Sequence, residues 1–379
     1  MSIRQAAVDI GNDALKAYVQ GLDHEIYIPN VIAEIGPSRD IVEFEKYPLD
    51  GLHVEILSGA LKRGQGTYAV GNLAGGYTHN DELTAVSEKS EADQPVVLLL
   101  TALAYDAAQS LGEKEGVIEA TYYLSTGLPL SEAKRGKRKT FKAKLKENTH
   151  EVRFKTTPEI GGKVVRLKFE EVLVNIEGHV ALIDLTTKED GTVRNEELTH
   201  MTVLINDIGG LSTDAAIIHE DGTVDNIYSD GIKEGVSPYL DEIIERVQHE
   251  IGYRFLNRQQ LVEVITSVNK EERNYIWFRG KRISIQSIVD EVLVKIAREE
   301  YKLIRSSWSK VPSIRVSYQI GGGSLLLKPY LEKINEQEEG YPLRFVGTKD
   351  SIWMIARAYY KLLAVYLQYK NEQVAATTE

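Results

Sequence analysis

The chain has 379 residues, a length that predicts two domains, each with its own buried core. Charged residues make up 27% of it and hydrophobic residues 42%, and the formal net charge of -11 argues against general attraction to DNA phosphates or anionic lipid. The absence of cysteine excludes disulfides, thiolate nucleophiles and cysteine-ligated metals. Without a signal-peptide core or a long uncharged apolar segment, the sequence predicts a cytoplasmic protein with no membrane contact.

The N-terminal segment predicts strands. Residues 3–10 and 15–20 form two apolar runs around a glycine turn. Residues 25–35 (EIYIPNVIAEI) predict another strand, broken at Pro29-Asn30.

The next segments predict a buried helix and two long strands. Residues 95–112 (PVVLLLTALAYDAAQSLG) are apolar nearly all round, so we expect a buried helix that starts at Pro95 and stops at Gly112. Residues 116–130 predict a core strand that ends near Ser125, and residues 165–185 a further strand followed by a helix.

The second half repeats the opening pattern. Residues 200–218 (HMTVLINDIGGLSTDAAII) again read as strand, aspartate, glycine turn and strand, which indicates a duplicated domain. Residues 316–334 predict a strand, a triple-glycine turn and a helix. Amphipathic spacing predicts helices over residues 238–252 and 287–304, and the chain is expected to close with a helix over 349–369 and a frayed polar tail. Alternating strands and helices favour an α/β fold.

The first glycine turn has the composition of a phosphate-binding loop. Gly11 permits close approach of a ligand, and Asn12 and Asp13 tolerate unusual turn dihedrals. Successive backbone N–H groups in such a turn can hold phosphate oxygens, and Lys16 can reach back as a point charge. The alternative is a simple hairpin turn.

The second turn offers the same chemistry with hydroxyl groups added. Gly209 and Gly210 permit close approach, and Ser212 and Thr213 supply hydroxyls. Asp207, like Asp9 in the first hairpin, ends the strand before the turn. Two carboxylates facing each other across a cleft suit Mg²⁺, which keeps most of its water.

In their order and spacing, these motifs resemble the actin-type ATPase superfamily of actin, DnaK-type chaperones, hexokinase-class sugar kinases and bacterial filament proteins. VDIGNDALKAYV resembles the first phosphate loop, NDIGGLSTDAAII the second, and YQIGGGSLLL the adenosine motif. NIEGHVAL falls where the first connecting helix begins and TKDSIWMIARAYYKL where the second lies, with Ala356 and Ala358 in place of the usual glycine. The resemblance covers nearly the whole chain.

This resemblance implies an α/β fold of the actin/DnaK/hexokinase type, with two related domains around an interdomain nucleotide cleft. Domain I would span residues 1–200, with the helices of about 340–379 packing back on it, and domain II residues 201–339. The plasmid-segregating actins of the ParM type are the most similar group, through STGLPLSEAKRGKRKTFKAKLKEN, GTYAVGNLA, IPNVIAE and DGIKEGVSPYLDEI.

The resemblance also implies roles for individual residues. Asp9 and Asp207 would hold the water shell of Mg²⁺, and Glu177, on the first connecting helix, would orient the attacking water. Without the resemblance, Glu177 reads as a solvated carboxylate at a helix N-terminus, and Lys233 and Glu234 as surface charges. The expected nucleotide-binding residues are Gly11, Asn12, Asp13, Ala14, Leu15 and Lys16; Gly209, Gly210, Leu211, Ser212 and Thr213; Lys233 and Glu234 at the nucleoside; and Gly321, Gly322, Gly323 and Ser324 at the adenine.

The run from Lys134 to Lys146 is basic and contains Phe141. It is compatible with the solvated face of an amphipathic helix, with a contact to DNA phosphates, or with a contact to an acidic surface of the next subunit.

The sequence therefore predicts an ATPase that binds ATP, or GTP in its place, with Mg²⁺ and forms cytoskeletal filaments. Hydrolysis would set the filament lifetime, and the filaments would move plasmid or phage DNA. Because the chain is acidic, DNA would be reached through a DNA-binding adaptor bound to a centromere-like site. The alternatives are a metabolite kinase of the same fold and a direct nucleic-acid binder that uses residues 134–146.

Overall fold

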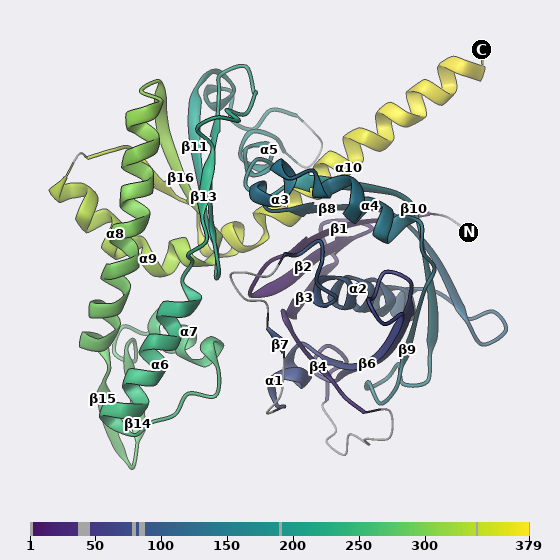
Figure 1. Ribbon diagram of the computed structural model, residues 1–379, viewed down its shortest axis with the longest axis horizontal. Coiled ribbons are helices and arrows are strands. Elements are labelled where there is room, and N and C mark those ends of the chain that lie inside the picture. The colour runs from purple at the N-terminus through teal and green to yellow at the C-terminus, as the bar shows by residue number, and fades with distance from the viewer. Residues whose placement is uncertain are drawn as a thin grey trace. The chain divides into compact units, whose positions relative to one another are not determined.

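The computed structural model describes residues 3–36, 46–77, 81–82, 88–188, 192–338 and 340–378. The chain divides into two compact units, shown in Figure 1. Unit 1 comprises Met1–Arg194 and Trp353–Glu379, and unit 2 comprises Asn195–Ile352. The boundaries predicted from the sequence lie at residues 200 and 340. In the described part of the chain no helix is long and apolar enough to cross a membrane.

Unit 1 is built on one ten-stranded sheet in the order β3-β2-β1-β8-β10-β9-β5-β6-β4-β7. Strands β1, β8 and β10 are parallel neighbours, and the other pairings are antiparallel. The strands are β1 Arg4–Ile10, β2 Ala14–Val19, β3 Glu25–Pro29, β4 Val31–Glu34, β5 Leu52–Ser58, β6 Gln65–Val70, β7 Asp81–Glu82, β8 Ile118–Leu128, β9 His150–Phe154 and β10 Val164–Ile176. The predicted break at Pro29-Asn30 separates β3 from β4, and β8 runs three residues beyond Ser125.

Helix α2 (Gln94–Ser110) lies inside the curve of this sheet, as Figure 1 shows. Its consecutive residues Leu98, Leu99 and Leu100 are all fully buried, although they point in three different directions around the helix. The predicted buried helix is thereby confirmed. Its apolar surface is needed on every side because strands of the sheet surround it.

The other helices of unit 1 are α1 Asn72–Gly75, α3 Leu130–Lys134, α4 Lys137–Lys146, α5 Ala181–Thr186 and most of α10 Thr348–Thr378. Helix α10 continues nine residues past the predicted end at 369, so the prediction of a frayed tail from that point is wrong. Glutamate, glutamine and two alanines in its last turns favour helix over coil.

Unit 2 contains the five-stranded sheet β13-β12-β11-β16-β17 and the hairpin β14-β15. The strands are β11 Thr202–Ile208, β12 Thr213–Ile218, β13 Asp230–Ile232, β14 Tyr275–Phe278, β15 Lys281–Ser284, β16 Ile314–Ile320 and β17 Leu343–Phe345. The helices are η1 Glu197–His200, α6 Ser237–Ile251, α7 Arg258–Thr266, α8 Gln286–Lys310 and α9 Gly321–Gln337. Helices α6 and α8 were predicted from their amphipathic spacing, and their apolar stripes form the core of the unit.

The two sheets share a local plan. In unit 1 the antiparallel hairpin β1-β2 lies beside β8, which runs parallel to β1. In unit 2 the antiparallel hairpin β11-β12 lies beside β16, which runs parallel to β11. Each hairpin carries one of the two glycine turns, so the repeat seen in the sequence is also a repeat of strand pairing.

Within unit 1, α5 is tied to α10 by a buried carboxylate. Asp184 is 1% exposed and accepts hydrogen bonds from Arg357 at 2.8 Å and from Lys361 at 2.8 Å. Lys361 is itself 4% exposed and also donates to the carbonyl oxygen of Thr187. Removing the carboxylate charge would leave two cations without their main partner.

We expect Asp184→Asn to lower the free energy of unfolding of unit 1 by about 3 kcal/mol, because breaking a buried ion pair on one side leaves its partner uncompensated. Denaturant unfolding of the full chain measures this. Glu55→Gln is the matched control, since Glu55 also faces two cations, Arg153 and Lys155, but is half-exposed. Equal losses in the two variants would show that burial of Asp184 has no special weight.

Candidate functional site

The first glycine turn joins β1 to β2. Asp9 lies at the end of β1, is 6% exposed, and its Oδ2 atom lies 3.6 Å from the Nζ of Lys16. A Cβ on Gly11 would lie 2.8 Å from the carbonyl oxygen of Ala14 and 2.8 Å from that Nζ, so a larger residue would force the turn open. The fold thus brings Asp9, Gly11 and Lys16 together.

This turn is held from behind by two amide side chains that the sequence analysis missed. Asn30 Nδ2 donates to the carbonyl oxygen of Gly11 at 2.6 Å, and the backbone N–H of Asn30 donates to that of Asp13 at 2.9 Å. Gln94, at the start of α2, donates in turn to Asn30 Oδ1 at 2.7 Å. The only sequence signal was the break at Pro29-Asn30.

The remaining residues of the first turn differ in exposure. Asn12 is half-buried and Asp13 is exposed. Ala14 and Leu15 are buried residues of β2, so only their backbone groups are available to a ligand.

Glu177 lies in the turn after β10, four residues before α5 begins at Ala181, so its predicted place on the first connecting helix is wrong. Its backbone N–H donates to the carbonyl oxygen of Leu128, which fixes the turn against β8. Both carboxylate oxygens accept from Lys89 Nζ at 2.9 Å. This pairing fixes the position of the Glu177 carboxylate.

Lys89 is 4% exposed and is the third residue that the sequence analysis missed. The backbone N–H groups of Lys89 and Ser90 donate to the buried carboxylate of Glu132 on α3 at 2.8 and 3.0 Å. Lys89 lies in a charged stretch without periodicity, so the sequence does not identify it as a site residue.

The ring of His179 is neutral near pH 7. Burial, aided by nearby Lys134 and Arg138, lowers its pKa to about 4.

Most charges of the basic run are engaged within unit 1. Phe141 and Leu145 anchor α4 in the core. Lys142 and Lys146 both pair with Glu171; burial opposes ionisation of this carboxyl, but the two lysines lower its pKa to about 2. Further contacts join Arg135 to Glu88, Lys137 to Glu91, Arg138 to the carbonyl of Val174, and Lys144 to the carbonyls of Ser90 and Ala92.

The second glycine turn joins β11 to β12 in unit 2. The carbonyl oxygens of Gly209 and Gly210 accept from the backbone N–H groups of Val236 and Ser237 at 3.1 and 2.7 Å. A Cβ on Gly235 would lie 2.4 Å from the Gly210 carbonyl oxygen, so the segment before α6 packs backbone to backbone against the turn.

The side chains of this turn differ in burial and in hydrogen bonding. Leu211 is buried, and Ser212 is half-buried. Thr213 is fully buried, and its hydroxyl donates to Glu300 Oε1 on α8 at 2.6 Å. Thr213 is thus a support of the turn in this structure.

Lys233 and Glu234 follow β13 directly. Lys233 is exposed, and Glu234 is half-buried and accepts a hydrogen bond from the hydroxyl of Tyr239 on α6. Burial and this carboxylate together raise the pKa of Tyr239.

The triple glycine forms the first turn of α9, whereas the sequence predicted a separate turn between strand and helix. Gly321 has φ +80°, and a Cβ there would lie 2.5 Å from Asp207 Oδ1. A Cβ on Gly323 would lie 2.7 Å from Ile208 Cγ2, while one on Gly322 would meet nothing within 4 Å. Gly321 and Gly323 therefore let α9 start against β11, and the open side is at Gly322. The Ser324 hydroxyl donates to the Gly321 carbonyl oxygen at 2.8 Å.

Asp9 and Asp207 are the carboxylates predicted to hold hydrated Mg²⁺, and they lie in different units. Each is the next-to-last residue of the strand before a glycine turn, and oxygen donors of this kind suit a cation that keeps most of its water. Across the described residues, no group of three or more histidine or acidic side chains has the spacing of a direct metal site.

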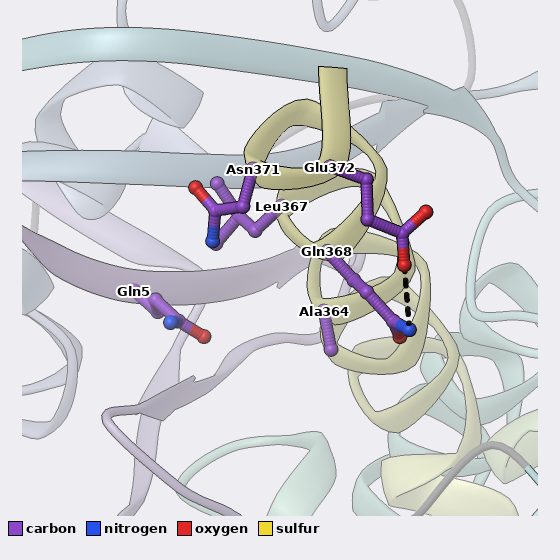
Figure 2. Close-up of a pocket in the computed structure, with 6 residues that line it drawn as sticks. All are labelled: Gln5, Ala364, Leu367, Gln368, Asn371 and Glu372. Atoms are coloured by element: carbon purple, nitrogen blue, oxygen red, sulfur yellow. Dashed lines mark hydrogen bonds between the residues drawn. The ribbon is translucent and has the colours of Figure 1, made fainter. Parts of the chain in front are cut away.

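Figure 2 shows a pocket of about 550 Å³ on unit 1 between β1 and the C-terminal half of α10. It is lined by Gln5, Ala364, Leu367, Gln368, Asn371 and Glu372. None of these side chains is cationic, and none belongs to the predicted nucleotide residues. The lining therefore offers a phosphate no positive side chain, and its Glu372 carboxylate would repel one.

Two family models match the chain. Residues 7–179 match the N-terminal domain of actin-like proteins, and residues 202–345 match the Alp7A C-terminal domain. Together these two ranges include both glycine turns and the glycine start of α9. No curated protein matched the chain by sequence.

Solved structures of similar fold include the actin-like protein Alp7A, with a TM-score of 0.78 at 18% identity over 99% of both chains. Bacillus thuringiensis ParM with ATP has a TM-score of 0.74 at 21% identity, over 97% of this chain and all of that one. The archaeal actin homologue Ta0583 has a TM-score of 0.67 at 17% identity, over 96% of this chain and all of that one. At these identities the likeness establishes the fold, and the predicted actin-type α/β fold is confirmed. The two glycine hairpins, the glycine start of α9 and both family matches agree, and the chain belongs to the actin-like protein family.

Proposed function

We propose that this protein is an ATP-dependent polymerising ATPase whose filaments segregate plasmid or phage DNA. The observation that carries the proposal is the pair of glycine hairpins. Each has an aspartate near the end of its first strand and turn carbonyls that accept hydrogen bonds from the rest of its unit. Similar ParM structures were solved with ATP, AMPPNP and ADP, which supports a nucleotide ligand.

In this proposal, one ATP is bound by the turns of both units. Asp9 and Asp207 orient waters around Mg²⁺, which neutralises phosphate charge when bound. Lys16 lies beside Asp9 and would reach a phosphate oxygen as a point charge. Glu177, held in place by Lys89, would orient the attacking water. GTP in place of ATP is the alternative ligand.

Nucleotide state would then control assembly. ATP that contacts both turns favours one arrangement of the units, and hydrolysis removes the γ-phosphate contacts that favour it. An open head-to-tail interface between identical subunits propagates into a filament, whereas a closed interface stops at a ring or dimer.

The basic run gives little support to direct DNA binding. Most of its cations contact carboxylates or carbonyl oxygens of unit 1, and the chain as a whole is acidic. We therefore propose that DNA is reached through a separate DNA-binding adaptor and that the protein acts in the cytoplasm.

We expect Asp9→Ala and Asp207→Ala each to lower ATP turnover by about tenfold or more, because each removes a charge-assisted hydrogen-bond acceptor for the hydrated cation. Phosphate release with Mg²⁺-ATP measures this. Asp23→Ala, after the same hairpin, is the control for loss of a carboxylate. Wild-type turnover in either Asp9→Ala or Asp207→Ala would contradict the metal assignment.

We expect Glu177→Ala to bind ATP and to assemble, but to hydrolyse ATP about a hundredfold more slowly, the typical contribution of a positioned acid–base group. Its filaments should therefore persist after ATP is diluted. Glu170→Gln on the same strand β10, at an exposed position, should behave as wild type. Loss of ATP binding, or filament disassembly at the normal rate, would contradict the water-orienting role of Glu177.

We expect light scattering to rise with Mg²⁺-ATP above a critical protein concentration and to stay flat with EDTA, because assembly requires the metal–nucleotide complex. Electron microscopy should show filaments in the same samples. A protein that stays monomeric with ATP and phosphorylates a small metabolite would instead be a kinase. A salt-dependent DNA shift by the isolated protein would favour direct binding.

A further inference from the structure

A carboxyl group lies fully buried at the centre of unit 2. Glu300, on α8, is 0% exposed. Its Oε1 atom accepts from the Thr213 hydroxyl at 2.6 Å, and its Oε2 atom lies 3.4 Å from Asn206 Nδ2. Asn206 Nδ2 also donates to Gln319 Oε1 at 3.0 Å. Of the described lysine, arginine and histidine side chains, none forms an ion pair with Glu300.

Every partner of this carboxyl belongs to a segment predicted to bind the nucleotide. Thr213 ends the second glycine turn, and Asn206 precedes Asp207 on β11. Gln319 lies opposite Asn206 on β16, two residues before Gly321. The Thr213 hydroxyl also lies 3.4 Å from the carbonyl oxygen of Glu234, in the segment expected at the nucleoside.

We propose that Glu300 is a positioning residue for nucleotide binding, and that it ties the second glycine turn, the Asp207 strand and the Glu234 segment into one preorganised surface. The inference rests on the proposed nucleotide function. It assigns to α8 the role of holding the nucleotide-binding segments in place. Glu300 itself is buried behind these segments, so its effect on nucleotide affinity passes through Thr213 and Asn206.

The neutral and ionised forms of Glu300 would bond this cluster differently, and only the neutral form has a proton of its own to donate. As the neutral acid, Glu300 can donate to Thr213 Oγ1, and the Thr213 proton is then free for the Glu234 carbonyl oxygen. As the carboxylate, it takes the Thr213 proton for itself, and the Glu234 carbonyl loses that donor. Asn206 Oδ1 is also buried without a partner among the described residues, so the cluster has acceptors to spare.

Burial and the nearest charge both favour the neutral form of Glu300. Burial raises the pKa of Glu300 to about 7 and the Glu234 carboxylate adds to the rise, although the hydrogen bonds from Thr213 and Asn206 oppose it. Glu234, from the segment before α6, is the charged group that faces the cluster, and α8, β11, β12 and β16 bring no cation to it among the described residues. Because this pKa lies above that of a free glutamate, the neutral form is complete at low pH and is lost as pH rises through about 7.

The test is the affinity for Mg²⁺ and a non-hydrolysable ATP analogue, measured by calorimetry on the full chain from about pH 6 to about pH 8, below the assembly threshold. We expect the wild-type affinity to fall by up to about tenfold over this range. Glu300→Gln, a permanently neutral isostere, should keep the low-pH affinity throughout. Taking the ratio of the two variants at each pH removes the titration of the nucleotide itself.

Two further variants separate positioning from folding. Glu299→Gln, the half-exposed neighbour that pairs with Lys302, should follow the wild-type profile. Thr213→Val should lower the affinity and remove its pH dependence, because the relay through the hydroxyl is gone. Wild-type ATP binding with parallel pH profiles in wild type and Glu300→Gln would overturn the inference alone. If Glu300→Gln folds poorly, the wild-type profile corrected for the separately measured titration of the free analogue decides, and a flat corrected profile overturns the inference. No nucleotide binding by wild type at any pH would overturn the proposed function as well.

Discussion

Both glycine turns are held from their carbonyl side, and the proposed binding of phosphate by their backbone N–H groups depends on this support. In unit 1 the Gly11 carbonyl oxygen accepts from Asn30, which is itself bonded by Gln94 of the central helix α2. In unit 2 the carbonyls of Gly209 and Gly210 accept from backbone N–H groups at the start of α6. The turns are thereby fixed to the buried core without side chains that would block a ligand.

The two units support their glycine turns with different chemical groups. The support in unit 1 is a chain of neutral amides, which carries no charge into the interior. The support in unit 2 includes the buried carboxyl of Glu300, whose burial is costly when it is ionised. The two hairpins have the same strand pairing, but in the described residues the support of the unit 2 hairpin includes a group that can gain or lose a proton, Glu300, whereas the support of the unit 1 hairpin consists of amides.

The sequence predicted the parts of the fold that local patterns determine. Apolar runs ending in Asp9 and Asp207, the all-round apolar α2 and the stripe of α8 each have a period or a terminal glycine that identifies them. Glu300 lies on the buried stripe of α8, together with Ile296, Ala297 and Ile304. The helical spacing alone therefore indicated a carboxylate at a core position. The role of Lys89 was not readable, because its partners Glu177 and Glu132 are distant in sequence and only the strand order brings them together. The start of α9 at Gly321 was also missed, since a glycine cluster normally ends regular structure and here permits close packing on Ile208.

The basic run shows how poorly a count of charges describes a surface. Its cations contact Glu88, Glu91 and Glu171, together with carbonyl oxygens near Lys89. Each exposed pair alone stabilises little, but several contacts converge on the segment from Glu88 to Ala92. That segment includes Lys89, which pairs with Glu177. In this arrangement the run stabilises unit 1 itself. It fixes the segment whose lysine holds the proposed water-orienting carboxylate, and it leaves little unpaired positive charge for a polyanion.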